Sequence, residues 1–146
     1  MEESIRNAFE TEKPNPDTMP VLTLAFIGDS AFELIVRTAF AEQKKDKGHA
    51  LSMRVQKLSS ARGQAAMAQV LQPFLTEEEA AVYRRGRNAQ PDSVSKHAGL
   101  GEYHRATGLE ALIGYLYLTG RTQRAAEIIR KGAERIHGAG KDEAGN

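Results

Sequence analysis

The chain has 146 residues, of which 40% are hydrophobic and 27% charged, and its 20 basic and 19 acidic side chains give a net charge of +1. This composition is typical of one globular domain and excludes a disordered or a membrane protein. The absence of cysteine excludes disulfides, thiolate metal sites and cysteine nucleophiles, and the near-neutral charge means that any nucleic-acid footprint must be local.

The first residues, Met1 to Arg6, are acidic and lack the basic start and apolar run of a secretory signal. No apolar stretch approaches the ~20 residues that a membrane span needs. We therefore expect a cytoplasmic protein without a membrane partner.

The first part of the chain predicts a flexible segment followed by a long helix. Residues 1–16 are polar and contain two prolines, so we expect them to be flexible. A helix then begins at Asp17 or Thr18, has Pro20 in its first turn and ends near Gln43. Its apolar residues recur at helical spacing, with Gly28 on the same stripe.

The middle of the chain predicts two more helices. Residues 49–72 are rich in Ala, Leu, Met and Gln, with a break or bend expected near Gly63. Thr76 and Glu79 form a capping-box pattern that opens a helix ending near Gly86. Residues 88–101 contain proline and glycines and predict a long loop.

The pattern predicts two further helices. The first spans residues 102–119 and is ended by Gly120, and the second spans residues 122–137. Residues 138–146 are expected to form a disordered tail. No alternation typical of strands occurs, so the sequence predicts an all-α helical bundle with a single domain at residues 17–137.

Two acidic residues, Asp29 and Glu110, interrupt stretches that otherwise have the pattern of core helices. An ionised carboxylate removed from water is costly unless it is paired or bound to a cation. If the two helices cross near Gly28 and Gly114, their backbones can approach closely enough for both carboxylates to face one point. Oxygen ligands of this kind suit Mg²⁺, with Mn²⁺ as a substitute, so the pair predicts a metal site.

The spacing alone leaves alternatives open. Asp29 can instead be an exposed residue of a polar helix face, and Glu110 a core glutamate paired with an arginine such as Arg105. If the metal site forms, Glu33 and Glu102 are candidates to lie beside the metal without binding it directly.

A second cluster is basic. Arg84, Arg85, Arg87 and Asn88 end the third predicted helix, and Lys96 lies in the loop that follows. Guanidinium groups can grip phosphates at two points and an amide can bond a 2′-hydroxyl, so these five residues are candidate RNA contacts. The alternative is a solvated helix end favoured by the helix dipole.

Several segments together resemble the ribonuclease III family, in particular its short bacterial branch, Mini-ribonuclease III, over about residues 18–137. The two acidic segments carry most of the resemblance, and their order and separation also fit. The matching segments are Phe26–Ala31, Lys57–Ala65, Arg84–Ala89, Tyr103–Gly108 and Leu109–Leu118.

The resemblance implies a catalytic domain that forms a symmetric homodimer and hydrolyses double-stranded RNA with magnesium, leaving 5′-phosphate ends. It assigns metal binding and catalysis to Asp29 and Glu110. The substrate that it implies is precursor 23S ribosomal RNA, matured at both ends, with a ribosomal protein as a further candidate partner. Residues of the first long helix, including Phe32 and Ile35, are candidates for the dimer face or for ordinary core.

Two positions depart from the larger members of the family, which carry acids where this chain has Ala25 and Thr107. This leaves the number of metal ions open. No double-stranded-RNA-binding domain is expected after the last helix, so affinity should come from the catalytic body. The alternative functions are a non-catalytic RNA-binding or ribosome-assembly module on the same scaffold, and a helical partner-binding protein without an RNA role.

Overall fold

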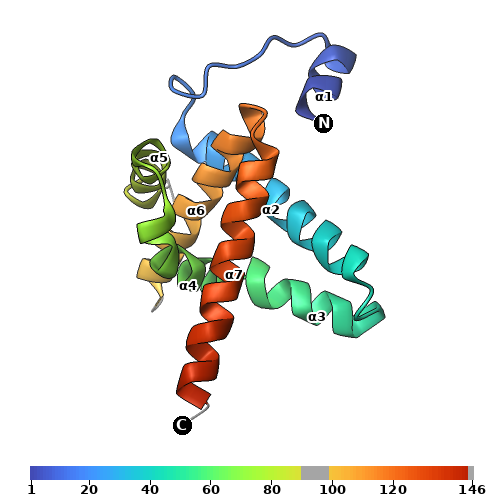
Figure 1. The fold of residues 1–146 in the computed structure, drawn as a ribbon. Coiled ribbons are helices and arrows are strands. Elements are labelled where there is room, and N and C mark those ends of the chain that lie inside the picture. The colour runs from blue at the N-terminus through green and yellow to red at the C-terminus, as the bar shows by residue number, and fades with distance from the viewer. Residues whose placement is uncertain (90–98, 145–146) are drawn as a thin grey trace.

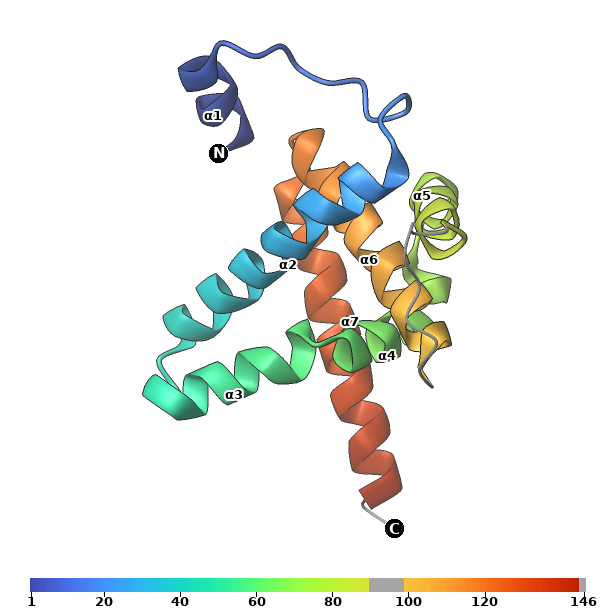
Figure 2. The same ribbon diagram turned by 180° about the vertical axis from the view of Figure 1, so that it is seen from behind.

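The computed structural model describes residues 1–89 and 99–144, with side chains described up to residue 137. Figures 1 and 2 show that the regular elements in these ranges are helices, which confirms the all-α class. In chain order they are α1 (Glu2–Phe9), α2 (Val21–Gln43), α3 (Gly48–Ser59), α4 (Ala61–Leu71), the short 3₁₀ helix η1 (Gln72–Phe74), α5 (Glu77–Arg87), α6 (Leu100–Leu118) and α7 (Thr122–Ala144).

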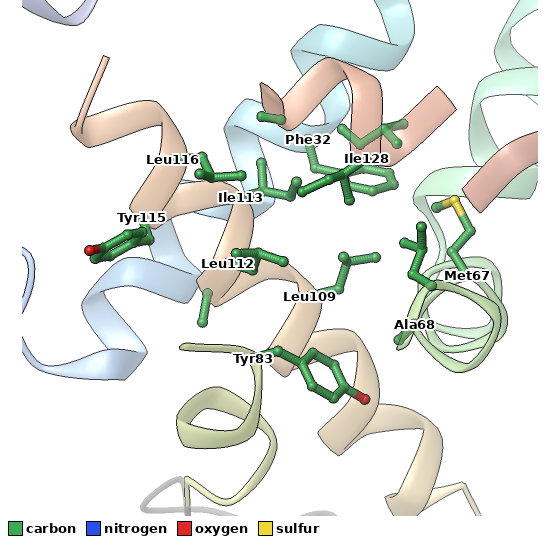
Figure 3. Close-up of a cluster of buried hydrophobic side chains, with 14 of the residues drawn as sticks. Phe32, Met67, Ala68, Tyr83, Leu109, Leu112, Ile113, Tyr115, Leu116 and Ile128 are labelled. Atoms are coloured by element: carbon green, nitrogen blue, oxygen red, sulfur yellow. The ribbon is translucent and has the colours of Figure 1, made fainter. Parts of the chain in front are cut away.

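Helix α6 is the centre of the bundle. Between Ala106 and Leu116 every residue except Glu110 is buried, so this helix has no polar face. A helix of this kind must be covered on all sides, and α2, α4, α5 and α7 surround it in both views (Figures 1 and 2). The core in Figure 3 combines α6 residues with one or two from each neighbour: Leu109, Leu112 and Ile113 meet Phe32, Met67, Ala68, Tyr83 and Ile128.

Several helix ends follow from local sequence as predicted. The Thr76 hydroxyl accepts a hydrogen bond from the Glu79 N–H at 3.2 Å, and the Glu79 carboxylate accepts one from the Thr76 N–H at 2.9 Å, which is the expected capping box. Gly120 follows α6 with a φ of 77°, a conformation that glycine adopts without strain. Helix α2 ends at Gln43, also as predicted.

Other boundaries differ from the prediction. Helix α2 begins only after Pro20, and residues 49–72 form two helices that separate at Ser60. The Ser60 hydroxyl caps α4 by accepting a hydrogen bond from the Gly63 N–H at 3.1 Å, so Gly63 lies inside the new helix. Helix α7 continues past residue 137 to Ala144, and no proline stops it there.

The N-terminal residues 1–16 include a short helix, α1, which Figure 1 shows at the end of an extended connection. The Arg6 guanidinium donates a hydrogen bond to the Leu118 carbonyl at 3.4 Å, while the Phe9 side chain is 76% exposed. None of the helices in the described ranges is both long enough and apolar enough to span a bilayer.

Candidate active site

Helices α2 and α6 cross at two glycines, as the sequence predicts. A Cβ atom on Gly28 would overlap the backbone carbonyl of Glu110 and lie 2.8 Å from the Gly114 nitrogen. A Cβ on Gly114 would overlap the Leu24 carbonyl in the same way. The two backbones therefore touch, and neither glycine can be replaced without moving a helix.

This crossing brings the Asp29 and Glu110 carboxyl groups together. Asp29 is exposed on α2, while Glu110 is partly buried on α6. The pKa of Glu110 is raised to about 8, first because burial disfavours its charged form. The negative charge of Asp29 raises it further, as does a hydrogen bond between the two carboxyls that requires Glu110 to be protonated. Two acids distant in the chain thus share one site.

No basic side chain of the described residues neutralises this pair. Neither Asp29 nor Glu110 forms an ion pair there, and only Asp29 contributes a charge to the pKa of Glu110. The alternative in which Arg105 pairs with Glu110 is therefore wrong, and the Arg105 Nε atom is buried without a hydrogen-bond partner.

The other acidic candidates lie apart from the pair. The Glu33 carboxylate accepts a hydrogen bond from Arg37 at 3.1 Å, one turn further along α2. Glu102 lies in the first turn of α6, two turns before Glu110. Among the described residues no three His, Asp or Glu side chains gather to form a metal site. A role for Glu33 and Glu102 beside a metal stays a prediction.

Two positions next to the pair supply no further carboxylate. Ala25, one turn before Asp29, is buried with 8% exposure. Thr107, three residues before Glu110, is also buried, and its hydroxyl donates to the Tyr103 carbonyl at 2.9 Å. That hydroxyl is used within its own helix, so the possible metal ligands at this point are the two carboxylates of Asp29 and Glu110.

This donor set fits a small divalent cation. Mg²⁺ keeps several waters and is commonly held by one or two carboxylates together with substrate phosphates. A cation between Asp29 and Glu110 would remove the repulsion that raises the Glu110 pKa and would offset the cost of burying that carboxylate. In the described ranges no basic side chain acts on Glu110, so only a proton or an added cation can remove the repulsion between the two carboxylates.

The basic candidates lie at the end of α5. Arg84 and Arg85 are exposed, and Arg87 is partly buried with its guanidinium carbon 5.8 Å from the centre of the Tyr83 ring. The Arg87 Nε donates to the Asn88 side-chain oxygen at 3.4 Å. None of the three arginines forms an ion pair within the part of the chain that the structure describes. The predicted contact Lys96 lies outside the described residues.

Two arginines of α7, Arg124 and Arg130, behave differently, because acidic side chains neutralise them. Arg124 donates to Glu79 at 2.7 and 2.8 Å, and Arg130 donates to Glu134 at 2.9 Å. The cations that have no acidic partner in the described ranges thus include those at the end of α5. A count of basic residues along the sequence does not separate the two sets, because the partner of Arg124 is 45 residues away.

Aromatic residues of α2 also take different roles. Phe32 is fully buried in the core, so it does not form an exposed dimer face, whereas Phe26 is 76% exposed. Phe26 precedes Asp29 by three residues and so lies on the same side of α2. Phe26 was not among the residues predicted for a dimer face on α2. The signal that could have identified it is the separate stripe Leu22–Phe26–Asp29 beside the core stripe Leu24–Gly28–Phe32.

Comparisons with known proteins place this chain in a family. The Ribonuclease III domain family matches residues 22–121. A Mini-ribonuclease 3 from Symbiobacterium thermophilum is 42% identical over 84% of this chain and 94% of its own length. A Mini-ribonuclease 3 from Brevibacillus brevis is 39% identical over 85% and 92%.

A solved structure also resembles the fold. The crystal structure of a Fusobacterium nucleatum protein superposes with a TM-score of 0.68 and 28% identity, covering 82% of this chain and 95% of the other. The long helices, the paired acids and these relatives lead to one assignment: the chain belongs to the ribonuclease III family of endoribonucleases.

Proposed function

We propose that this chain cleaves double-stranded RNA with Mg²⁺, and that Asp29 and Glu110 hold the metal and carry the catalysis. The observation that supports this most strongly is the crossing of α2 and α6. It holds two carboxylates against each other without a neutralising side chain among the described residues. Burial of an unpaired acid destabilises a fold, so such a pair is typical of a functional site.

When bound there, Mg²⁺ would supply positive charge for the phosphate oxygens and lower the pKa of a coordinated water. The protein's own part is to position the ligands. The glycine crossing fixes the backbone of Glu110, and the buried core on either side of it prevents rotation of α6. Asp29 remains open to solvent, so the pair is accessible to an RNA phosphate.

The substrate is proposed to be held through its phosphates by Arg84, Arg85 and Arg87. A-form RNA hides most base edges in a deep, narrow groove, so a cluster of guanidiniums reads the shape of a duplex more than its sequence. Asn88 and Lys96 complete the proposed contacts. Because Arg84, Arg85 and Arg87 have no acidic partner in the described ranges, they can neutralise phosphates without breaking an ion pair.

We further propose a symmetric homodimer that uses the exposed side of α2. Leu22, Phe26 and Leu34 expose 38%, 76% and 47% of their surfaces. Phe26 shares a side of the helix with Asp29, so an isologous contact through Phe26 would bring two active sites near the dimer axis. Two sites so placed can cut both strands of one duplex.

The proposed natural substrate is precursor 23S ribosomal RNA in the cytoplasm, with a ribosomal protein as the candidate that presents it. This follows the resemblance to the Mini-ribonuclease III branch. Within the same scaffold the alternative is a non-catalytic RNA-binding module.

The test incubates the purified chain with a perfect RNA duplex, with and without Mg²⁺, and analyses the product ends. We expect Mg²⁺-dependent cutting that leaves 5′-phosphates and is lost in Asp29→Asn and Glu110→Gln, while Glu42→Gln, an exposed α2 acid, cuts normally. Duplex binding without cutting by the unaltered chain would favour the non-catalytic module. Normal cutting by either site variant would refute the assigned residues.

A further inference from the structure

We propose that Arg87 and Arg105, arranged around the Tyr83 side chain, form a binding site for one RNA backbone phosphate other than the phosphate that is cleaved. This inference rests on the proposed action on duplex RNA and adds Arg105 to the substrate contacts. Helices α5 and α6 create the site at the point where the two are packed most closely.

The packing of α5 on α6 explains why the two arginines meet. A Cβ on Gly108 would lie 2.8 Å from the Tyr83 ring, and a Cβ on Gly86 would lie 2.7 Å from the Ala111 side chain. The missing side chains allow α5 to lie directly on α6. The turn of α6 that contains Thr107, Gly108 and Ala111 therefore faces the last turns of α5, where Arg87 lies.

Tyr83 lies near both cations. The side chain is only 2% exposed, and Figure 3 shows its hydroxyl pointing away from Leu109 and Leu112, out of the apolar cluster. Burial raises the pKa of Tyr83, while the charges of Arg87 and Arg105 both act to lower it. Both guanidiniums thus lie near this phenol, on the same side of α6.

Arg105 has positive charge but no anion in the described residues. Its Nε atom is buried and has no hydrogen-bond partner, and no ion pair forms there with either Arg105 or Arg87. Leaving a buried charged donor unpaired costs free energy. The unpartnered Arg105 Nε and the nearby charge of Arg87, which has no ion pair among the described residues, together suit a phosphate, which accepts hydrogen bonds from several donors at once.

The phosphate cannot be the one at the metal site. Arg105 precedes Glu110 by five residues, which places it ~7.5 Å along the axis of α6 and about 140° around it. Glu110 faces α2, whereas Arg105 faces α5. The site would therefore hold a separate phosphate of the duplex and fix its position relative to the cleaved bond.

The test measures duplex binding with Mg²⁺ in the Asp29→Asn background. Arg105→Gln and Arg87→Gln should each weaken binding about tenfold and reduce the slope of log affinity against log salt by about 0.7 to 0.9. Arg105→Lys should recover part of the loss, and Arg130→Gln, an arginine paired with Glu134, should bind like the parent. Thermal unfolding of each variant shows whether its fold is intact.

A second measurement identifies the shared phosphate. Binding is measured for a set of RNA duplexes, each of which has one backbone phosphate replaced by a neutral methylphosphonate. The replaced position moves along the strand from one duplex to the next, always at a 2′-O-methylated nucleotide. One position should weaken binding of the parent but not of Arg87→Gln, which changes a helix end and should fold even if Arg105→Gln does not. If both variants bind as the parent does, or if their losses map to different phosphates, the shared site is refuted while duplex cleavage stands. If the parent binds no duplex, both proposals fail.

Discussion

Gly28 and Gly114 face each other where α2 crosses α6, so closely that a Cβ on either residue would overlap the backbone of the opposite helix. The same crossing places Asp29 beside Glu110. The position of the two carboxylates therefore depends on the absence of two side chains.

Gly28→Ala should destabilise the fold by about 3 kcal/mol, because the helices must separate to admit the methyl group. It should also weaken divalent-cation binding, since the two carboxyls separate with the helices. Gly132→Ala on α7 is the matched control. Its Cβ would lie 3.1 Å from atoms of the Leu71 and Met67 side chains, and no backbone atom is among its three nearest neighbours. Urea denaturation measures both variants, and equal stabilities for Gly28→Ala and the unaltered chain would contradict the crossing.

The raised pKa of Glu110 predicts a pH-dependent stability in the absence of divalent cations. The unfolded chain loses the Glu110 proton above about 4.5, whereas the folded chain keeps it up to about 8. The unfolding free energy of the unaltered chain should therefore fall, relative to Glu110→Gln, as the pH rises from 4.5 to 8. Denaturation in EDTA at several pH values measures this. A pH-independent difference would show that Glu110 is not buried beside a second acid.

The ion pair of Glu79 with Arg124 predicts the opposite pH dependence. Hydrogen bonds from Arg124 are the largest cause of the lowered Glu79 pKa, so the pair stabilises the fold above pH 4.5 and is lost as the pH falls through the lowered value. Glu79→Gln keeps the capping pattern but should cost about 3 kcal/mol near pH 7.

The difference in unfolding free energy between the unaltered chain and Glu79→Gln should become smaller in acid, as measured by denaturant titration. The exposed Glu127→Gln serves as control, since Glu127 lies 3.7 Å from Arg124. A loss for Glu79→Gln that stays constant down to pH 2 would exclude the charge pair as its cause.

The exposed Phe26 predicts a dimer that is sensitive to one residue. Phe26→Asp should raise the dimer dissociation constant at least about a hundredfold, because a symmetric contact loses the buried ring twice. Phe9→Asp is the control, because both phenylalanines are 76% exposed. Sedimentation equilibrium gives the masses. This interface would be excluded if the Phe26→Asp variant stays dimeric, or if the unaltered chain is already a monomer.

Local sequence patterns predicted much of the fold. The capping box at Thr76 and the glycine after α6 depend on residues a few positions apart, so their chemistry can be read directly. The Gly28–Gly114 crossing was also predictable, because two glycines on two apolar stripes leave few other ways to pack.

Features that depend on distant partners were not predictable. The sequence puts Phe26 and Phe32 on two separate stripes of α2, and the packing of α6 against one of these stripes decides that Phe32 is core and Phe26 is surface. The proposed role of Arg105 depends on its position near Tyr83, which belongs to a different helix, α5. The break at Ser60 has a local cause instead: glycine predicts a break near Gly63, but the Ser60 hydroxyl caps α4 three residues earlier and Gly63 lies inside the helix.

The most direct test of the central claim is a titration of the purified chain with Mn²⁺, followed by electron paramagnetic resonance of the free ion. The shared carboxylate site predicts that the unaltered chain binds Mn²⁺, that Mg²⁺ competes, and that Asp29→Asn and Glu110→Gln each lose this binding while Glu42→Gln retains it. Equal Mn²⁺ binding by the unaltered chain and either site variant would contradict the claim.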